Sequence, residues 1–252
     1  MEGLDSDKIA ALLGAGYPGR IHVFGELDST NSWLLENGAC GDCCLAEKQT
    51  CGRGRRGKQW LSPANGNIYL SLRWCFTHPP ELLPLLSLLV GISVCKSLHD
   101  SGLRGHGLKW PNDILVGENK LAGILVETSN NMQTVVIGLG LNVYTVGSAD
   151  EQNTWGSLQQ FMAHVPDRND LIASIVNDLY DLLSNLPNLQ YKDFEKGWNQ
   201  WDLLSGNNVS LVQADKKYSG VVQGVDSLGR ILLQQEHGKI TAFSSAELSL
   251  RW

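Results

Sequence analysis

The spacing of hydrophobic residues predicts alternating strands and helices over the first two hundred residues. Residues 67–74 alternate between the two faces of a β-strand, with Ile68 and Leu70 on one face and Tyr69 and Ser71 on the other. Further strands are expected at 21–24, 43–48, 108–110, 114–116, 120–127 and 134–142. Helical spacing predicts helices over 82–98, 168–186 and 191–202, a short helix before residue 20, and one capped by residues 28–31.

The pattern changes after Ser205 and Gly206, where short strands alternate with turn signals every 8–10 residues. Strands are expected at 209–213, 220–225, 230–235 and 240–243, a spacing typical of a small β-barrel. The sequence therefore predicts an α+β protein with two domains, residues 1–204 and residues 205–252.

Composition places the chain among ordinary globular proteins, since 42% of its 252 residues are hydrophobic and 18% are charged. A net charge of −6 disfavours a free-standing nucleic-acid binder, which usually carries a basic balance. No run of 18 apolar residues and no signal peptide is visible, so we expect a cytoplasmic protein without a membrane partner.

Six cysteines lie within the first 95 residues, at positions 40, 43, 44, 51, 75 and 95. Cys40 and Cys43 form a CxxC pair, but a structural zinc site needs four ligands and no second pair follows. Zinc or redox chemistry stays open as the minor alternative. We expect reduced thiols, mostly buried in a strand and its entry turn.

The most prominent local motif is the glycine- and arginine-rich segment from Gly52 to Lys58, with four positive charges in seven residues. It matches the dinucleotide pattern G-x-G-x-x-G, but the following residues, Lys58 to Pro63, do not open the helix that this fold requires. A mobile arginine loop suits an anion such as phosphate. A solvated surface or a nucleic-acid patch is the alternative.

A second motif, Lys109-Trp-Pro-Asn-Asp113, presents polar side chains at a rigid strand exit, because Pro111 restricts both itself and Trp110. Asp113 could hold Mg²⁺ on a phosphate. The alternative is a simple turn between two strands. A third motif places Lys120 at the start of an otherwise apolar strand, where its ammonium could enter a pocket or stay in solvent.

Together and in this order, these motifs resemble the biotin–protein ligases. The ordered set comprises Ser29–Asn31, Gln49 with Gly52–Gly57 and Trp60, Lys109–Asp113, Lys120–Glu127, Gly138–Asn142 and Trp155. The resemblance covers about residues 21–252. It implies the catalytic fold shared with class II aminoacyl-tRNA synthetases, followed by an SH3-like β-barrel.

The resemblance implies that biotin and MgATP form biotinoyl-5′-AMP and pyrophosphate, and that biotin then passes to a lysine of an acceptor. The implied acceptor is the biotin carboxyl carrier part of acetyl-CoA carboxylase. Family members often form homodimers. Those that act as repressors carry an N-terminal winged helix. Here only about 20 residues precede the first strand, so we expect no DNA binding.

Residue roles follow from the same resemblance. Lys120, Arg53, Arg55 and Asp113 are the expected catalytic groups, with Asp113 also the expected Mg²⁺ ligand. The expected biotin-binding residues are Ser29, Thr30, Asn31, Gln49, Gly52, Arg53, Gly54, Arg55, Lys120, Gly123, Gly138 and Gly140. The expected ATP-binding residues are Arg56, Lys58, Trp60, Lys109, Asn112, Asp113, Asn142 and Trp155, where Trp155 either stacks on adenine or fills the core.

Two alternative functions remain. A lipoate–protein ligase would share the fold and the adenylate chemistry, although the two basic motifs together are not expected in it. A regulator would bind biotinoyl-AMP without transferring it, but no DNA-reading element is visible. Biotin labelling of an acceptor domain discriminates among the three.

Overall fold

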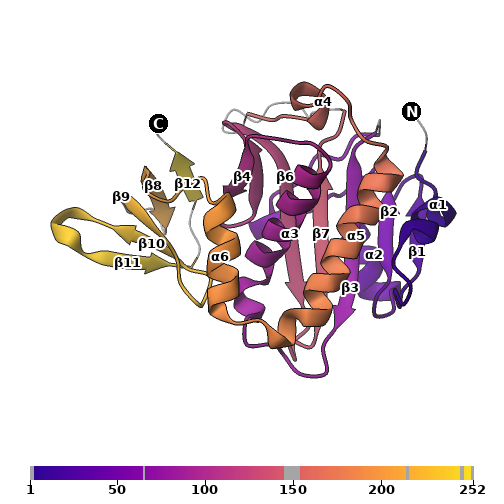
Figure 1. Ribbon diagram of the computed structural model, residues 1–252, viewed down its shortest axis with the longest axis horizontal. Helices are drawn as coiled ribbons and strands as arrows, with labels where there is room; N and C mark the ends of the chain where they lie inside the picture. Colours follow the sequence, from indigo (N-terminus) through magenta and orange to yellow (C-terminus); the bar gives the residue numbers. More distant parts are fainter. Residues whose placement is uncertain (1–2, 65, 145–153, 214–215, 245–246, 251–252) are drawn as a thin grey trace.

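The computed structural model describes residues 3–64, 66–144, 154–213, 216–244 and 247–250. Its main body is a seven-stranded sheet in the order β1-β2-β3-β7-β6-β5-β4 (Figure 1). Only the β1–β2 pair is parallel, and every other neighbouring pair is antiparallel. The strands are Ile21–Phe24 (β1), Cys43–Ala46 (β2), Ile68–Cys75 (β3), His106–Lys109 (β4), Asp113–Val116 (β5), Asn119–Thr128 (β6) and Thr134–Leu141 (β7).

The helices are distributed unequally over the two faces of the main sheet. The α-helices are Ser6–Leu12 (α1), Thr30–Asn37 (α2), Leu86–Asp100 (α3), Leu158–Phe161 (α4), Arg168–Asn185 (α5) and Tyr191–Trp201 (α6). Short 3₁₀ turns occupy Arg55–Gly57, Leu83–Leu85, Leu186–Asn188 and Glu236–Gly238. Helices α3 and α5 cross one face side by side (Figure 1). Helix α2 packs on the strands β2, β3 and β7, where Leu34 meets Cys44 and Val136 in a cluster separate from the main core.

The apolar segment predicted over 82–98 is a core helix preceded by a 3₁₀ turn. Among the described residues, Leu83–Asp100 is long and apolar enough to cross a membrane, with a mean hydropathy of 1.3. A helix buried in a protein core passes the same test, and 61% of this segment is buried against the sheet and α5.

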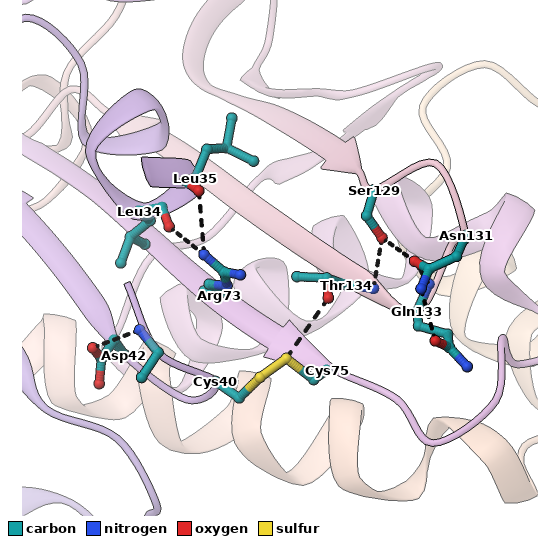
Figure 2. The surroundings of a disulfide bond; sticks show 11 residues. Leu34, Leu35, Cys40, Asp42, Arg73, Cys75, Ser129, Asn131, Gln133 and Thr134 are labelled. Atoms are coloured by element: carbon teal, nitrogen blue, oxygen red, sulfur yellow. Dashed lines mark hydrogen bonds between the residues drawn. A yellow bond between two sulfur atoms is a disulfide. The ribbon is translucent and has the colours of Figure 1, made fainter. Parts of the chain in front are cut away.

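Two tethers hold the C-terminal end of α2 against β3 (Figure 2). Arg73 Nη1 donates to the carbonyl oxygens of Leu34 at 2.8 Å and Leu35 at 3.3 Å. Just beyond the helix, Cys40 forms a disulfide with Cys75 at the end of β3. Our expectation that all six cysteines are reduced is therefore wrong for this pair, because the β2–β3 pairing brings together two residues 35 positions apart.

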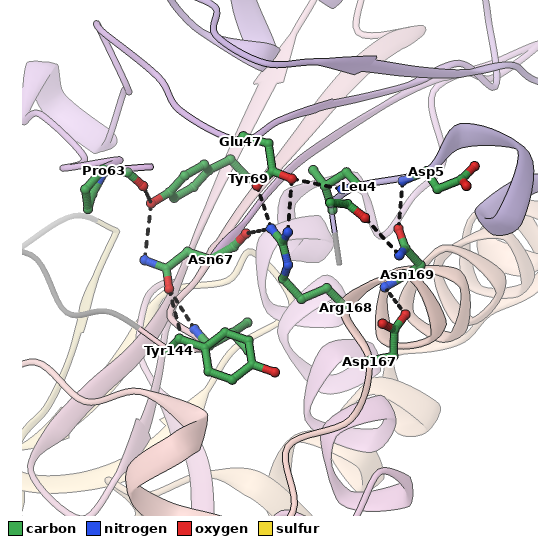
Figure 3. A network of polar contacts seen from close by, with 12 residues as sticks. Leu4, Asp5, Glu47, Pro63, Asn67, Tyr69, Tyr144, Asp167, Arg168 and Asn169 are labelled. Carbon is green, nitrogen blue, oxygen red and sulfur yellow. Dashed lines mark hydrogen bonds and ion pairs between the residues drawn. The ribbon is translucent and has the colours of Figure 1, made fainter. Parts of the chain in front are cut away.

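A buried arginine joins segments that are distant in sequence (Figure 3). Arg168, at the start of α5, donates to both carboxylate oxygens of Glu47 at 2.7 and 3.0 Å and to the Asn67 carbonyl at 3.1 Å. The Asn67 side chain accepts the backbone N–H groups of Val143 and Tyr144. The ends of β2 and β7 and the start of β3 are thereby held together.

The C-terminal strands form a separate antiparallel sheet in the order β11-β10-β9-β8-β12. They are Asn208–Gln213 (β8), Lys216–Val225 (β9), Ile231–Gln234 (β10), Ile240–Phe243 (β11) and Glu247–Leu250 (β12). The expected small β-barrel corresponds to this five-stranded antiparallel sheet, and within the described ranges its edge strands β11 and β12 do not pair with each other. The predicted boundary at 204/205 falls in the connection between α6 and β8.

Candidate active site

A single cavity of about 870 Å³ gathers nearly all of the predicted site residues. Of these, only Gly52 and Asn142 do not line it. Residues that we did not predict also line it: Gln59, Leu70, Trp110, Pro111, Leu115, Glu118, Ile124, Leu125, Leu139, Thr154 and Val212. Val212 belongs to the C-terminal sheet, so both sheets contribute to the cavity.

One end of the cavity is a chain of uncharged hydrogen-bonding groups. Gln49 Oε1 accepts from the Thr30 N–H at 2.9 Å and from Thr30 Oγ1 at 3.2 Å, and Gln49 Nε2 donates to Ser62 Oγ at 2.9 Å. Ser71 Oγ lies 2.7 Å from Thr30 Oγ1 and contacts Asn31 Oδ1. Ser29 caps α2 by accepting the Ser32 N–H. The cap holds the first turn of α2, and with it Thr30 and Asn31, over the sheet.

Three glycines on one face of the sheet leave room for larger side chains above them. Gly140 and Gly123 are neighbours across β7 and β6, and an added Cβ would lie 2.3 and 2.8 Å from the Trp60 ring. A Cβ on Gly138 would lie 2.4 Å from Asn31 Oδ1. Gly138 and Gly140 are among the expected biotin-binding residues, but here Asn31 and Trp60 cover them. Trp60, predicted on the ATP side, thus packs on two predicted biotin-side glycines.

The other end of the cavity is cationic. Six lining residues are basic (Arg53, Arg55, Arg56, Lys58, Lys109 and Lys120) and two are acidic (Asp113 and Glu118). Burial lowers the pKa of Lys109, and the nearby Lys120 lowers it further. Burial likewise lowers the pKa of Arg55, with a further contribution from Arg56. Concentrated positive charge in a partly desolvated cavity is the environment that binds a polyanion.

Lys120 occupies the junction between the two ends. Its Nζ lies 2.7 Å from Asp113 Oδ1 and 5.3 and 5.4 Å from the ring centroids of Trp60 and Trp155. Hydrogen bonds from Lys120 N to Thr154 O, 2.7 Å, and from Gly156 N to Lys120 O, 3.0 Å, hold Trp155 beside the strand. Trp155 therefore lines the cavity. The indole N–H groups of both tryptophans are buried and have no acceptor within the described ranges.

The glycine- and arginine-rich loop closes on itself. Gly54 N donates to Lys58 O at 2.7 Å, and Trp60 N donates to Gly52 O at 2.9 Å, around a 3₁₀ turn. Arg56 has a positive φ of 56° in this turn. A single 3₁₀ turn is no helix, which agrees with our rejection of the dinucleotide motif. Arg53 forms an ion pair with Glu127.

Gly52 and Asn142 do not line the cavity, and each instead holds neighbouring backbone in place. An added Cβ at Gly52 would lie 2.4 Å from the Trp60 carbonyl oxygen, so glycine lets the loop close. Asn142 is buried and donates to the Gly156 carbonyl at 3.1 Å, which ties β7 to the segment carrying Trp155. Asn142, predicted to bind ATP, therefore lies outside the cavity lining.

Sequence reasoning missed Ser71, Ser62 and Glu127. Ser71 had a usable signal, because it is a polar residue in the alternating strand 67–74. Its partner across the sheet is Gly138, which only the strand order reveals. Glu127 was part of a quoted motif but received no role.

The surroundings of Asp113 do not suit a protein-held magnesium ion. Its carboxylate is paired with Lys120, and its charge also acts on Lys109 and Arg55. Within the described ranges no three His, Cys, Asp or Glu residues group as metal ligands, zinc ligands included. Magnesium normally keeps several waters and binds one or two free carboxylates plus phosphate oxygens. Asp113 alone does not provide that set.

Comparison with known proteins agrees with this geometry. Residues 24–142 match the Biotin/lipoate A/B protein ligase family, and residues 204–251 match the Biotin protein ligase C terminal domain. The chain is 34% identical to the bifunctional ligase/repressor BirA of Salmonella typhimurium, over 98% of this chain and 78% of that protein. It is 32% identical to the biotin–[acetyl-CoA-carboxylase] ligase of Mycobacterium tuberculosis, over 88% and 86%.

Solved structures show the same relationship. The biotin protein ligase of Aquifex aeolicus in complex with biotin and ATP superposes with a TM-score of 0.77 at 29% identity, covering 92% of this chain and 98% of that one. Both parts of the sequence therefore have counterparts in one kind of enzyme, and the cavity is lined by the main body together with Val212 of the C-terminal sheet. This chain belongs to the biotin protein ligase family.

Proposed function

We propose that this protein activates biotin with ATP to biotinoyl-5′-AMP and transfers the biotin to a lysine of a carrier domain. The observation that carries the proposal is one cavity with an uncharged hydrogen-bonding end and a cationic end, joined at Lys120. Relatives named as biotin ligases and a relative solved with biotin and ATP support it.

The uncharged end suits the biotin bicycle. A ureido group needs both donors and acceptors, which Ser29, Thr30, Asn31 and Gln49 carry, while the apolar rings need an apolar wall. Trp60 on the glycine patch of Gly123 and Gly140 offers that wall. Placing Trp60 here moves it from the ATP side to the biotin side of our assignment.

The cationic end suits the triphosphate. In the first step a biotin carboxylate oxygen attacks the α-phosphorus, a new P–O bond forms, and the bond to pyrophosphate breaks. Lys120 lies where this carboxylate and the α-phosphate would meet, and Lys109, Arg55 and Arg56 line the neighbouring wall. Fixed cations stabilise the charge on the phosphoryl oxygens in the transition state. Trp155 is positioned to stack on adenine.

In the second step the neutral amine of the carrier lysine attacks the carbonyl carbon of the adenylate, and AMP leaves with the C–O bond electrons. This step depends mainly on proximity. The arginine loop would exclude water from the adenylate until the carrier arrives. ATP would enter as its magnesium complex, with the metal held by phosphate oxygens.

The remaining assignments are proposals of the same kind. A biotin carboxyl carrier domain, such as that of acetyl-CoA carboxylase, is the proposed acceptor, and the cytoplasm is the proposed compartment. A homodimer and the absence of DNA binding stay predictions, which size-exclusion chromatography and an operator-binding assay would test.

Lys120→Ala tests the function and the position of its central cation together. We expect wild-type protein to transfer biotin to a carrier domain only with MgATP, and the variant to lose about 100-fold or more in rate, the usual effect of removing one transition-state donor. A streptavidin blot measures the transfer. Lys239→Ala, at an exposed lysine just before β11 of the C-terminal sheet, is the control.

Three results would contradict this assignment. Transfer that survives in Lys120→Ala would move the essential cation elsewhere in the cavity. Tight biotin binding without any transfer in the wild type would favour the regulator. Transfer of lipoate in preference to biotin would favour the lipoate ligase.

A further inference from the structure

Glu127 lies just outside the cavity on the same face of the sheet as the site. It belongs to β6, where Gly123 and Leu125 line the cavity and alternate residues share a face. The Glu127 side chain is 29% exposed, so its charge is partly removed from solvent. None of the roles assigned above uses this carboxylate.

One oxygen of Glu127 joins three separate elements. Oε2 accepts a hydrogen bond from Asn31 Nδ2 at 2.9 Å, and the same oxygen forms the ion pair with Arg53 Nη2. Asn31 lies in the first turn of α2, and Arg53 begins the arginine loop. A carboxylate on the sheet therefore contacts both α2 and the arginine loop.

The contact determines how Asn31 presents its amide. With Nδ2 donating to Glu127, Oδ1 faces Ser71 Oγ and the open position above Gly138. A reversed amide would place Oδ1 against the Glu127 carboxylate, an unfavourable contact between two acceptors. Glu127 thus selects one of the two amide orientations.

The ion pair with Glu127 also restricts the position and the available charge of Arg53. Its guanidinium is balanced by Glu127, and its backbone pairs with Gln59 across the loop. Anchoring Arg53 therefore also positions the rest of the arginine loop. Two backbone hydrogen bonds, from Gly54 N to Lys58 O and from Trp60 N to Gly52 O, connect this part of the loop to Trp60. The other basic residues of the cavity lining include Arg55, Arg56 and Lys109.

We propose that Glu127 is a positioning residue for biotin: it anchors Arg53 and orients Asn31, and so builds the uncharged end of the cavity. The proposal rests on the proposed function and deepens it. It changes the part of Arg53 from an expected catalytic and biotin-binding group to an anchor of the loop.

The test compares Glu127→Gln with Glu195→Gln by isothermal titration calorimetry with biotin. Glu195 is an exposed acid on α6 that does not line the cavity. Loss of an acid by itself would strengthen the binding of an anionic ligand. We expect Glu127→Gln to bind biotin about five-fold more weakly, the effect of a lost partly exposed ion pair, and Glu195→Gln to bind no more weakly than wild type.

Steady-state kinetics distinguish positioning from a general structural loss. For Glu127→Gln we expect a higher KM for biotin, with kcat and the KM for ATP within about two-fold of wild type. The melting temperature should stay close to that of wild type. Arg53→Gln should bind biotin as weakly as Glu127→Gln. The double variant should bind biotin no more weakly than either single variant, because both changes break the same ion pair between Glu127 and Arg53.

Equal or tighter biotin binding by Glu127→Gln would overturn the proposal, as would additive losses in the double variant. A lower kcat with an unchanged KM for biotin would also overturn it. Wild-type protein that fails to bind biotin would overturn this proposal and the proposed function together. Normal wild-type binding with an unaffected variant would overturn the positioning role alone.

Discussion

At the scale of single residues, the shape of the site depends on two glycines as well as on its larger side chains. Gly123 and Gly140 lack the Cβ atoms that would occupy the space now taken by Trp60. Neither glycine has a positive φ, so backbone freedom is not the reason for glycine there. Close approach of an aromatic ring to the sheet is the reason.

Gly140→Ala should therefore disturb the cavity without straining the backbone. The added methyl group would lie 2.3 Å from the Trp60 ring, and the indole must move. Overpacking of this kind costs about 1–3 kcal/mol, so we expect biotin affinity to fall about ten-fold or more. Calorimetric titration measures it. Gly25→Ala is the matched control, because nothing lies within 4 Å of its added Cβ. Unchanged affinity in Gly140→Ala would show that Trp60 does not shape the biotin end.

At the scale of elements, α2 carries part of the uncharged end of the site. Its first turn presents Thr30 and Asn31, and its last turn is held by Arg73 and by the disulfide between Cys40 and Cys75. A helix of eight residues is too short to be stable alone. Its position therefore comes from these tethers and from the Leu34 cluster.

Cysteine labelling tests this tether. Burial raises the pKa of the Cys43 thiol to about 12 and also raises the pKa of the Cys44 and Cys95 thiols. These thiols stay protonated and shielded at pH 8, whereas Cys51 is exposed. We expect iodoacetamide to modify one cysteine in the native protein, four after unfolding without reductant, and six after unfolding with reductant, as read by mass spectrometry.

Two further results identify the labelled thiol and test the disulfide between Cys40 and Cys75. Cys51→Ser should abolish native labelling. Six modifications after unfolding without reductant would show that the bond between Cys40 and Cys75 is absent, and the earlier expectation of reduced thiols would then hold for every cysteine.

At the scale of the whole molecule, a few part-buried hydrogen bonds join the main body to the C-terminal sheet. Other polar contacts, made by Arg168, join the ends of strands that are distant in sequence. Trp110 Nε1 donates to the Gly229 carbonyl at 2.9 Å, and Tyr191 Oη donates to the Val225 carbonyl at 2.5 Å. Both contacts join the main body to the C-terminal sheet. Trp110 lies between Lys109 and Pro111, so the C-terminal sheet supports the strand exit that lines the cationic end.

Arg168→Leu should reveal the contact that holds the strand ends together. Burial by itself would raise the pKa of Glu47, but hydrogen bonds from Arg168 and from the Leu4 N–H outweigh it and lower this pKa below its usual value. Removing the cation leaves a part-buried carboxylate and the Asn67 carbonyl short of donors. We expect a loss of about 2–4 kcal/mol in the free energy of unfolding by urea at pH 7.

The pH dependence of this loss has a definite sign. A depressed carboxylate pKa stabilises the folded state above the ordinary value of about 4.3, and the stabilisation disappears as the pH falls through the folded-state pKa. The difference between wild type and Arg168→Leu should therefore shrink below about pH 4. Lys8→Ala, at an exposed pair with Asp167, should lose less than about 1 kcal/mol. A difference that is constant with pH would exclude Glu47 as the partner that matters.

The sequence by itself determined the order and type of most elements and most of the residues that line the cavity. Hydrophobic periodicity is a local property, so the alternation over 67–74 and the helical spacing over 168–186 could be read without a fold. The site residues could be read because they cluster in short motifs whose order along the chain resembles one family.

Only the tertiary structure decided which of these residues touch. Glu127 and Arg53 are 74 positions apart, and Cys40 and Cys75 are 35 apart, so their contacts depend on strand order and register. Whether the C-terminal strands close a barrel depends on whether the edge strands β11 and β12 pair, which local spacing does not encode. The local chain encodes the faces of each element, while the pairing of distant faces is a property of the packed molecule.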